Sequence, residues 1–113
     1  MKSGRITAAL RRTIVRRILR VAAPRKVILF GSAARSAMTP DSDIDLLVIE
    51  DTAPDPRGES VRIREALGRL GRPVDVIVME SPWFEASKRV FGGLAYPAHR
   101  EGRVLHEAAG PHP

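Results

Sequence analysis

The sequence predicts a small α/β domain in which helices flank a mixed sheet. Three short aliphatic runs, bounded by Gly, Pro and Asp, have the composition of buried strands. They cover residues 26–30, 44–49 and 73–79. Helical patterns separate them, and this alternation predicts crossover connections within one sheet. A chain of 113 residues is long enough to bury one core, so we expect a single domain over residues 1–113.

Helical periodicity is strongest in two stretches. Residues 60–70 have one apolar face, and we expect this helix to stop at Gly71 after a polar, proline-broken loop at residues 51–58. The first stretch predicts a helix that ends before Pro24. Its apolar residues recur at helical spacing: Ile6, Leu10, Ile14, Ile18 and Val21.

The last third of the chain is expected to hold a helix, a turn and a short strand. Ser81 and Pro82 have the residue types of an N-cap and a first helical residue, in a helix that extends to about residue 90. We expect a turn at residues 96–101, a strand at 104–105 and a disordered tail at 108–113. Core packing is the expected role of the aromatic side chains: Trp83, Phe84, Phe91 and Tyr96.

Two carboxylates stand one residue apart where the second predicted strand begins. Side chains alternate along a strand, so Asp43 and Asp45 emerge on one side while Ile44 points to the other. A divalent ion would remove their repulsion, and oxygen ligands favour Mg²⁺ over zinc. Asp75 completes this cluster if the third strand lies beside the second. Within a buried strand, the Asp75 carboxylate would need a cation or a hydrogen-bond donor.

A Gly-Ser turn follows the first predicted strand. Gly31 allows the backbone to turn tightly, and Ser32 offers a hydroxyl and an N–H at the start of a short helical turn. The start of a helix binds phosphate, because its N–H groups are unpaired and its dipole favours negative charge. The sequence therefore predicts a phosphate site ahead of the metal site.

Together these features form a pattern of a Gly-Ser turn, a nearby arginine and three aspartates: Gly31, Ser32, Arg35, Asp43, Asp45 and Asp75. The pattern resembles the active-site signature of the polymerase-beta-type nucleotidyltransferases. More narrowly, residues 6–107 are similar to the minimal nucleotidyltransferase domains, and the resemblance implies their polymerase-beta-like fold. One departure is Ser36, which stands where the family pattern has a second glycine.

The resemblance implies an enzyme that transfers a nucleoside monophosphate from an NTP, expected to be ATP, to an acceptor hydroxyl. Asp43 and Asp45 would bind two Mg²⁺ ions, and Asp75 would ligate the ion that activates the acceptor. Asp75 is also a candidate for accepting the acceptor's proton. Ser32 and the N–H groups of the turn would hold the outer phosphates, with Arg35 as a second candidate for phosphate contact.

The acceptor is expected on a partner protein, because larger nucleotidyltransferases use an extra domain to bind it. Minimal nucleotidyltransferases are commonly paired with HEPN-type ribonuclease toxins. The resemblance therefore implies an antitoxin that transfers AMP to a tyrosine of the toxin, within a hetero-oligomer of a type VII-like toxin-antitoxin pair.

Charge leaves two alternatives open. The net charge is +6, and residues 1–26 contain nine Lys or Arg and no acid. Four arginines share one face of the first predicted helix, which is either a solvated face or a docking stripe for an acidic partner or nucleic acid: Arg5, Arg12, Arg16 and Arg20. Two functions other than nucleotide transfer therefore remain: a non-catalytic antitoxin that acts by contact and a basic nucleic-acid-binding domain.

Composition also bounds the cellular context. The chain has no cysteine, which excludes disulfides and thiolate metal sites. It contains neither an apolar run long enough to span a membrane nor the pattern of a signal peptide. We therefore expect a cytoplasmic protein without a membrane partner.

Overall fold

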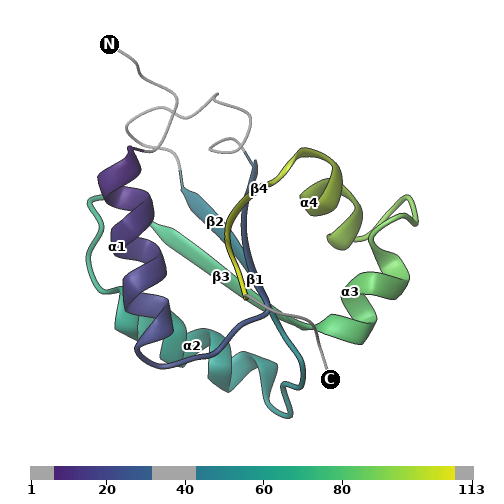
Figure 1. Cartoon of the computed structure of the whole chain (residues 1–113), viewed down its shortest axis with the longest axis horizontal. Coiled ribbons are helices and arrows are strands. Elements are labelled where there is room, and N and C mark those ends of the chain that lie inside the picture. The colour runs from purple at the N-terminus through teal and green to yellow at the C-terminus, as the bar shows by residue number, and fades with distance from the viewer. Residues whose placement is uncertain (1–6, 32–42, 109–113) are drawn as a thin grey trace.

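The computed structural model describes residues 7–31 and 43–108, which fold into a four-stranded mixed sheet between two layers of helices (Figure 1). The strands are β1 (Lys26–Phe30), β2 (Ile44–Glu50), β3 (Val74–Glu80) and β4 (Arg103–Glu107), in the order β3-β2-β1-β4. β2 and β3 run parallel, whereas β1 is antiparallel to both β2 and β4. The predicted mixed α/β architecture is confirmed, and the third strand does lie beside the second.

Helices of the described residues cover both faces of the sheet (Figure 1). α1 (Ala8–Leu19) and α2 (Pro56–Leu67) lie on one face, and α3 (Ser81–Ser87) and α4 (Ala95–Glu101) lie on the other. Alternate β2 residues point into the two layers, as period-two alternation requires. Under α1 and α2 the core includes Ile14, Ile18, Ile44, Leu46 and Ile63; under α3 and α4 it includes Ile28, Leu47, Ile49, Phe84 and Ala98.

Helix α2 begins earlier and ends earlier than the expected 60–70. Asp55 is its N-cap, and its side chain accepts a hydrogen bond from the Gly58 N–H at 3.1 Å. Proline fits the first turn of a helix because no intrahelical partner is needed there, so Pro56 starts the helix rather than breaking it. The helix ends at Gly68 (φ +62°) instead of at Gly71, and the loop expected at 51–58 is correspondingly shorter.

The C-terminal third also differs from expectation. The N-cap of α3 is Glu80 rather than Ser81, and the helix ends at Ser87 instead of reaching residue 90. Residues 96–101, expected as a turn, belong to helix α4. The last strand is five residues long rather than two.

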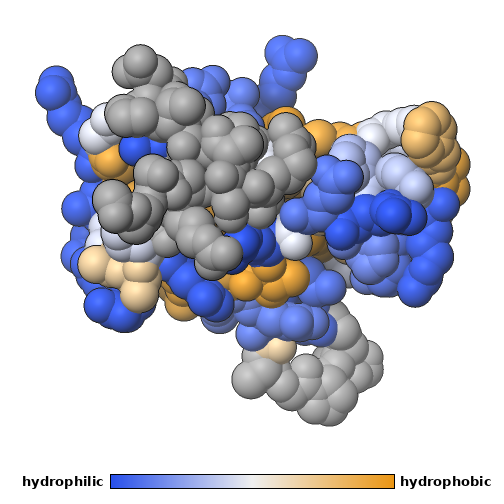
Figure 2. Space-filling view, turned by 90° about the horizontal axis from the view of Figure 1, so that it is seen from above, coloured by the Kyte–Doolittle hydropathy of each residue, from blue (hydrophilic) through white to orange (hydrophobic). Residues whose placement is uncertain are grey.

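Only one of the aromatic side chains expected in the core is fully buried there. Phe84 is 1% exposed, while Trp83 and Phe91 are 66% and 85% exposed. Trp83 precedes Phe84 on a short helix, so its side chain projects away from the sheet. Tyr96 is half-buried and stacks edge-on against Phe91 with ring centroids 5.3 Å apart. Hydrophobic surface accordingly appears at the right-hand end of Figure 2, where α3 and α4 lie.

Two further expectations concern the ends of the chain and membranes. Residues 109–113 of the predicted tail lie outside the described residues, but Ala108 is held by a 2.9 Å hydrogen bond from its N–H to the carbonyl of Arg25. Within residues 7–31 and 43–108, no helix has the length and apolar character needed to cross a bilayer.

Candidate active site

The turn after β1 is packed directly against a predicted catalytic carboxylate. Phe30, the last residue of β1, pairs with Asp45 of β2, which brings the next residue, Gly31, beside the Asp45 side chain. Gly31 has φ +74°, and a Cβ there would collide with Asp45 Oδ2 and lie 3.4 Å from Asp45 Cγ. Glycine is therefore required for both its backbone conformation and its lack of a side chain. The other predicted phosphate ligands, Ser32 and Arg35, lie outside the described residues.

Two of the three predicted carboxylates face each other across the parallel strands. In the register of β2 and β3, Asp45 pairs with Asp75. Asp45 lies on the side of β2 that also carries Leu47, which packs under α3 and α4, while Ile44 belongs to the opposite core. Asp43, two residues before Asp45, falls on the same side by strand alternation. The sheet therefore brings all three aspartates to the end where β2 and β3 begin (Figure 1).

Electrostatics couple the three carboxylates. Burial is the largest cause of a raised pKa at Asp45, and the negative charges of Asp75 and then Asp43 raise that pKa further. A bound cation would oppose these effects by stabilising the ionised carboxylate. The chemistry of this donor set, three carboxylates with no nitrogen or sulfur, fits Mg²⁺.

The ligand set is not gathered into a finished metal cluster. Among the residues that the structure describes, no group of three or more His, Cys, Asp or Glu side chains is placed to hold a metal ion. The donor type thus agrees with the predicted magnesium site, while the assembly of the carboxylate oxygens around an ion stays a prediction.

Asp75 lies in a different environment from the one expected. It is exposed, because β3 is an edge strand of the sheet and not a buried central one. The expectation that Asp75 needs a partner to offset the cost of burial is therefore wrong. The half-buried carboxylate is Asp45, on the central strand β2.

One buried carboxylate was missed by the sequence reasoning. Glu50, the last residue of β2, is 8% exposed, and its Oε2 has no hydrogen-bond partner among the described residues. Burial raises its pKa to about 7, with further contributions from a hydrogen bond to Glu59 and from the charge of Glu59, against a lowering by Arg62. Glu50 follows Ile44, Leu46 and Val48 at a period of two, so alternation could have placed it in the core. It lies at the opposite end of β2 from Asp45, outside the candidate site.

A four-stranded mixed sheet flanked by helices, with aspartates where two parallel strands begin, is consistent with a nucleotidyltransferase fold. The sequence pattern of the nucleotidyltransferase domain family matches residues 11–101, which is most of the chain. The chain belongs to this family, whose members typically use a nucleoside triphosphate and a divalent metal. A search of curated proteins found no match to the chain.

Proposed function

We propose that the protein is a Mg²⁺-dependent enzyme that moves AMP from ATP to a tyrosine of a HEPN-type ribonuclease toxin and so acts as its antitoxin. The observation that carries the proposal is the pairing of Asp45 with Asp75 on parallel strands, next to Gly31. This arrangement offers carboxylates to a metal and places Gly31, which has no side chain, beside Asp45. The family membership supports the transferase chemistry.

The three carboxylates divide into two roles in the proposed reaction. Asp43 and Asp45 would hold both Mg²⁺ ions, and Asp75 the ion on the acceptor side. When bound, these ions would neutralise the triphosphate and lower the pKa of the acceptor hydroxyl. The acceptor oxygen bonds to the α-phosphorus, the bond from that phosphorus to the β-bridging oxygen breaks, and pyrophosphate leaves with the electron pair. Asp75, which is exposed, would take the acceptor's proton or pass it to water.

A protein acceptor is supported by the surface around Asp75. Asp43 and Asp75 are exposed, so a bulky acceptor can approach them. Ile77 lies two residues beyond Asp75 on the same side of the edge strand β3 and is 37% exposed. Apolar surface beside a catalytic group suits contact with another protein. The choice of a HEPN-type toxin rests on the resemblance to the minimal nucleotidyltransferase domains.

The test is transfer of label to the protein encoded by the neighbouring gene. With Mg²⁺, ATP labelled at the α-phosphate should label a tyrosine of that protein, while ATP labelled at the γ-phosphate should not. Asp43→Asn and Asp45→Asn should abolish labelling without lowering the temperature of thermal unfolding, and Glu65→Gln, at an exposed position on α2, is the matched control. Full transfer by the doubly substituted enzyme would refute the assigned role of the carboxylates.

The same assay separates the alternatives. Inhibition of the toxin only when label appears on it supports the enzyme. A stable complex that inhibits the toxin without any label would identify an antitoxin that acts by contact. RNA binding that weakens steeply with salt, without either result, would identify a nucleic-acid-binding domain.

A further inference from the structure

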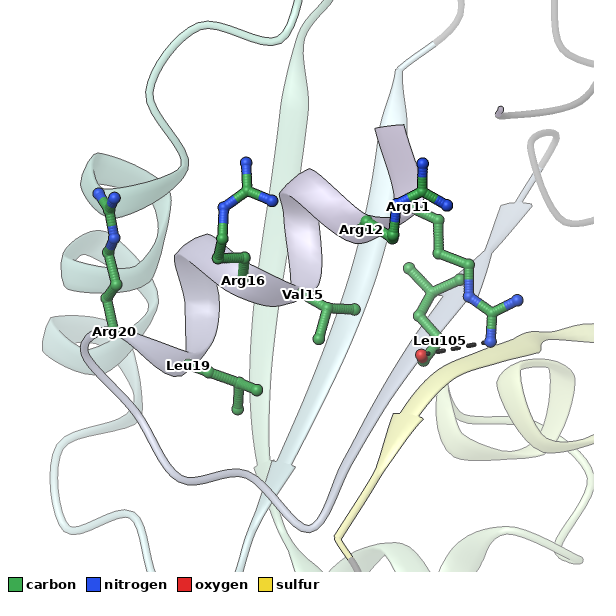
Figure 3. Close-up of a pocket in the computed structure, with 7 residues that line it drawn as sticks. All are labelled: Arg11, Arg12, Val15, Arg16, Leu19, Arg20 and Leu105. Carbon is green, nitrogen blue, oxygen red and sulfur yellow. Dashed lines mark hydrogen bonds between the residues drawn. The ribbon is translucent and has the colours of Figure 1, made fainter. Parts of the chain in front are cut away.

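A groove of about 540 Å³ runs between α1 and the edge strand β4 (Figure 3). Its apolar lining comes from Val15 and Leu19 on the helix and Leu105 on the strand. Leu19 is 44% exposed, although it is a large hydrophobic residue. Figure 3 shows Val15 and Leu19 projecting from the same side of α1. The groove therefore presents a short apolar strip, in which Leu19 is exposed, Val15 is half-buried and Leu105 is only 8% exposed.

A row of arginines borders this strip. Arg12, Arg16 and Arg20 are spaced four residues apart along α1 and point to a common side in Figure 3. All three are exposed, and none forms an ion pair with another residue in the described ranges. Like charges at this spacing on a helix destabilise it slightly. Within residues 7–31 and 43–108, the positive charge of this row is therefore not neutralised, and an acidic ligand would neutralise it.

Another arginine of α1, Arg11, connects the two sides of the groove. Arg11 donates a hydrogen bond from Nη2 to the carbonyl of Leu105 at 3.4 Å, which ties α1 to β4 (Figure 3). A second hollow of about 500 Å³ continues past Arg11 and Leu105 to Val104, which is 44% exposed. The hollowed surface therefore extends beyond the arginine row, along the edge strand.

We propose that this groove is the docking site for an acidic amphipathic helix of a partner protein. From Arg12 to Arg20 the row spans about 12 Å, the rise of roughly two helical turns. A partner helix with Glu or Asp at positions i, i+4 and i+8 would match the three arginines. Leu or Ile on the adjacent stripe of that helix would cover Val15, Leu19 and Leu105.

The lining favours a helix over nucleic acid. Nucleic acid neutralises arginines equally well, but single-stranded binding sites add aromatic side chains on which bases stack. The residues that line this groove are arginines and aliphatic side chains, with no aromatic among them. An exposed aliphatic strip gains little from a phosphate backbone, whereas the apolar face of a helix would bury it.

Docking at the groove does not depend on the proposed transfer reaction. α1 packs on the face of the sheet that receives Ile44, whereas Asp45 lies on the opposite face. A helix in the groove therefore leaves the carboxylates free, and a different segment of the partner would supply any acceptor. Asp43→Asn with Asp45→Asn should bind the helix as the unmodified protein does, so failure of transfer and failure of docking are distinguishable.

The experiment uses fluorescence anisotropy with four labelled probes: an acidic amphipathic 18-residue helix, its lysine-for-glutamate counterpart, a scrambled acidic peptide and a 20-nucleotide single-stranded RNA. The acidic helix should bind best. Arg12→Glu with Arg16→Glu should weaken its binding roughly tenfold or more, because two attractions become repulsions. Arg57→Glu with Arg64→Glu makes the same charge change on α2 and should leave binding within about twofold of the unmodified protein.

Leu19→Ser separates the apolar contribution from charge. This substitution should weaken binding of the acidic helix severalfold without changing the binding of RNA. Because Leu19 is at the surface, the variant should fold normally, and thermal unfolding can check this. The proposal is overturned if the scrambled peptide binds as well as the amphipathic one. It is equally overturned if RNA binds more tightly and loses its affinity in the arginine variant, or if the groove variants dissociate a homodimer of the chain.

Discussion

Replacing Glu50 with glutamine is expected to stabilise the protein above neutral pH. Glu50 is buried at the end of β2, and its pKa is raised to about 7, mainly by burial. Above that pH, folding must hold a charged carboxylate in the core, next to the carboxylate of Glu59. Glutamine has nearly the same shape and carries no charge at any pH, so this cost disappears.

The magnitude follows from the difference between the folded and unfolded pKa of Glu50. An unfolded glutamate titrates near 4.5 and the folded one near 7. Because the folded pKa is the higher one, the stabilisation is complete below pH 4.5 and is lost as the pH rises through 7. At about 1.4 kcal/mol per pKa unit, the difference between the two pKa values corresponds to a loss of stability of roughly 3 kcal/mol at most. The pKa of Glu59 is lowered, chiefly by its hydrogen bond to Glu50, and this opposes part of the effect. We expect a net loss of ~1–2 kcal/mol from pH 5 to pH 8.

Urea unfolding followed by circular dichroism at pH 5, 6, 7 and 8 measures this directly. The unmodified protein should lose stability across the series, and Glu50→Gln should have a flatter profile. Asp45 also has a raised pKa, so a small slope of the same sign should persist in the variant. Glu65→Gln, at an exposed position, should follow the unmodified protein. If stability falls with pH equally in Glu50→Gln and in the unmodified protein, the assignment of a destabilising buried charge to Glu50 is refuted.

Two glycine substitutions test the packing around the site and beneath α4. Gly31→Ala should abolish nucleotide transfer and destabilise the fold by about 1–3 kcal/mol. The added Cβ would collide with the Asp45 carboxylate, and residue 31 has a backbone φ of +74° that favours glycine. Full transfer by this variant in the labelled-ATP assay would contradict the prediction. Gly102→Ala should destabilise the fold by about 1–3 kcal/mol, because its Cβ would overlap the Ala98 carbonyl and the Ile28 side chain. Thermal unfolding measures this loss, which should come without a selective loss of nucleotide affinity. An unchanged melting temperature would show that β4 can shift to accommodate the methyl group.

Local periodicity predicted the elements whose sequences are regular, and it failed where one residue type has two roles. Ile14 and Ile18 were identified by helical spacing and are fully buried. Pro56 falls in the loop expected at 51–58, yet with Asp55 ahead of it this proline starts α2. In α4, where a turn was expected, Pro97 likewise lies in the first turn of the helix, a position that needs no N–H partner.

The candidate site was predictable in its residues but not in their environment. Alternation placed Asp43 and Asp45 on one side of a strand, whereas the pairing of Asp45 with Asp75 depends on strand order, which local sequence does not determine. The exposure of Asp75 follows from the same strand order. The groove could not be predicted from local sequence for a related reason: Arg11 and Leu105, which meet across it, are 94 residues apart in the chain.

The contact between Arg11 and Leu105 also connects the proposed docking site with the lifetime of the protein in the cell. β4 is an edge strand held by β1 on one side, and Arg11 of α1 reaches its carbonyl at Leu105. A ligand that spans α1 and β4 would oppose the fraying of the last strand, and binding to the folded state alone adds about 2.7 kcal/mol at a concentration one hundred times its Kd. Proteases act on frayed chains, so the free protein would be degraded faster than the bound one. The amount of this protein in the cell would then follow the amount of its partner.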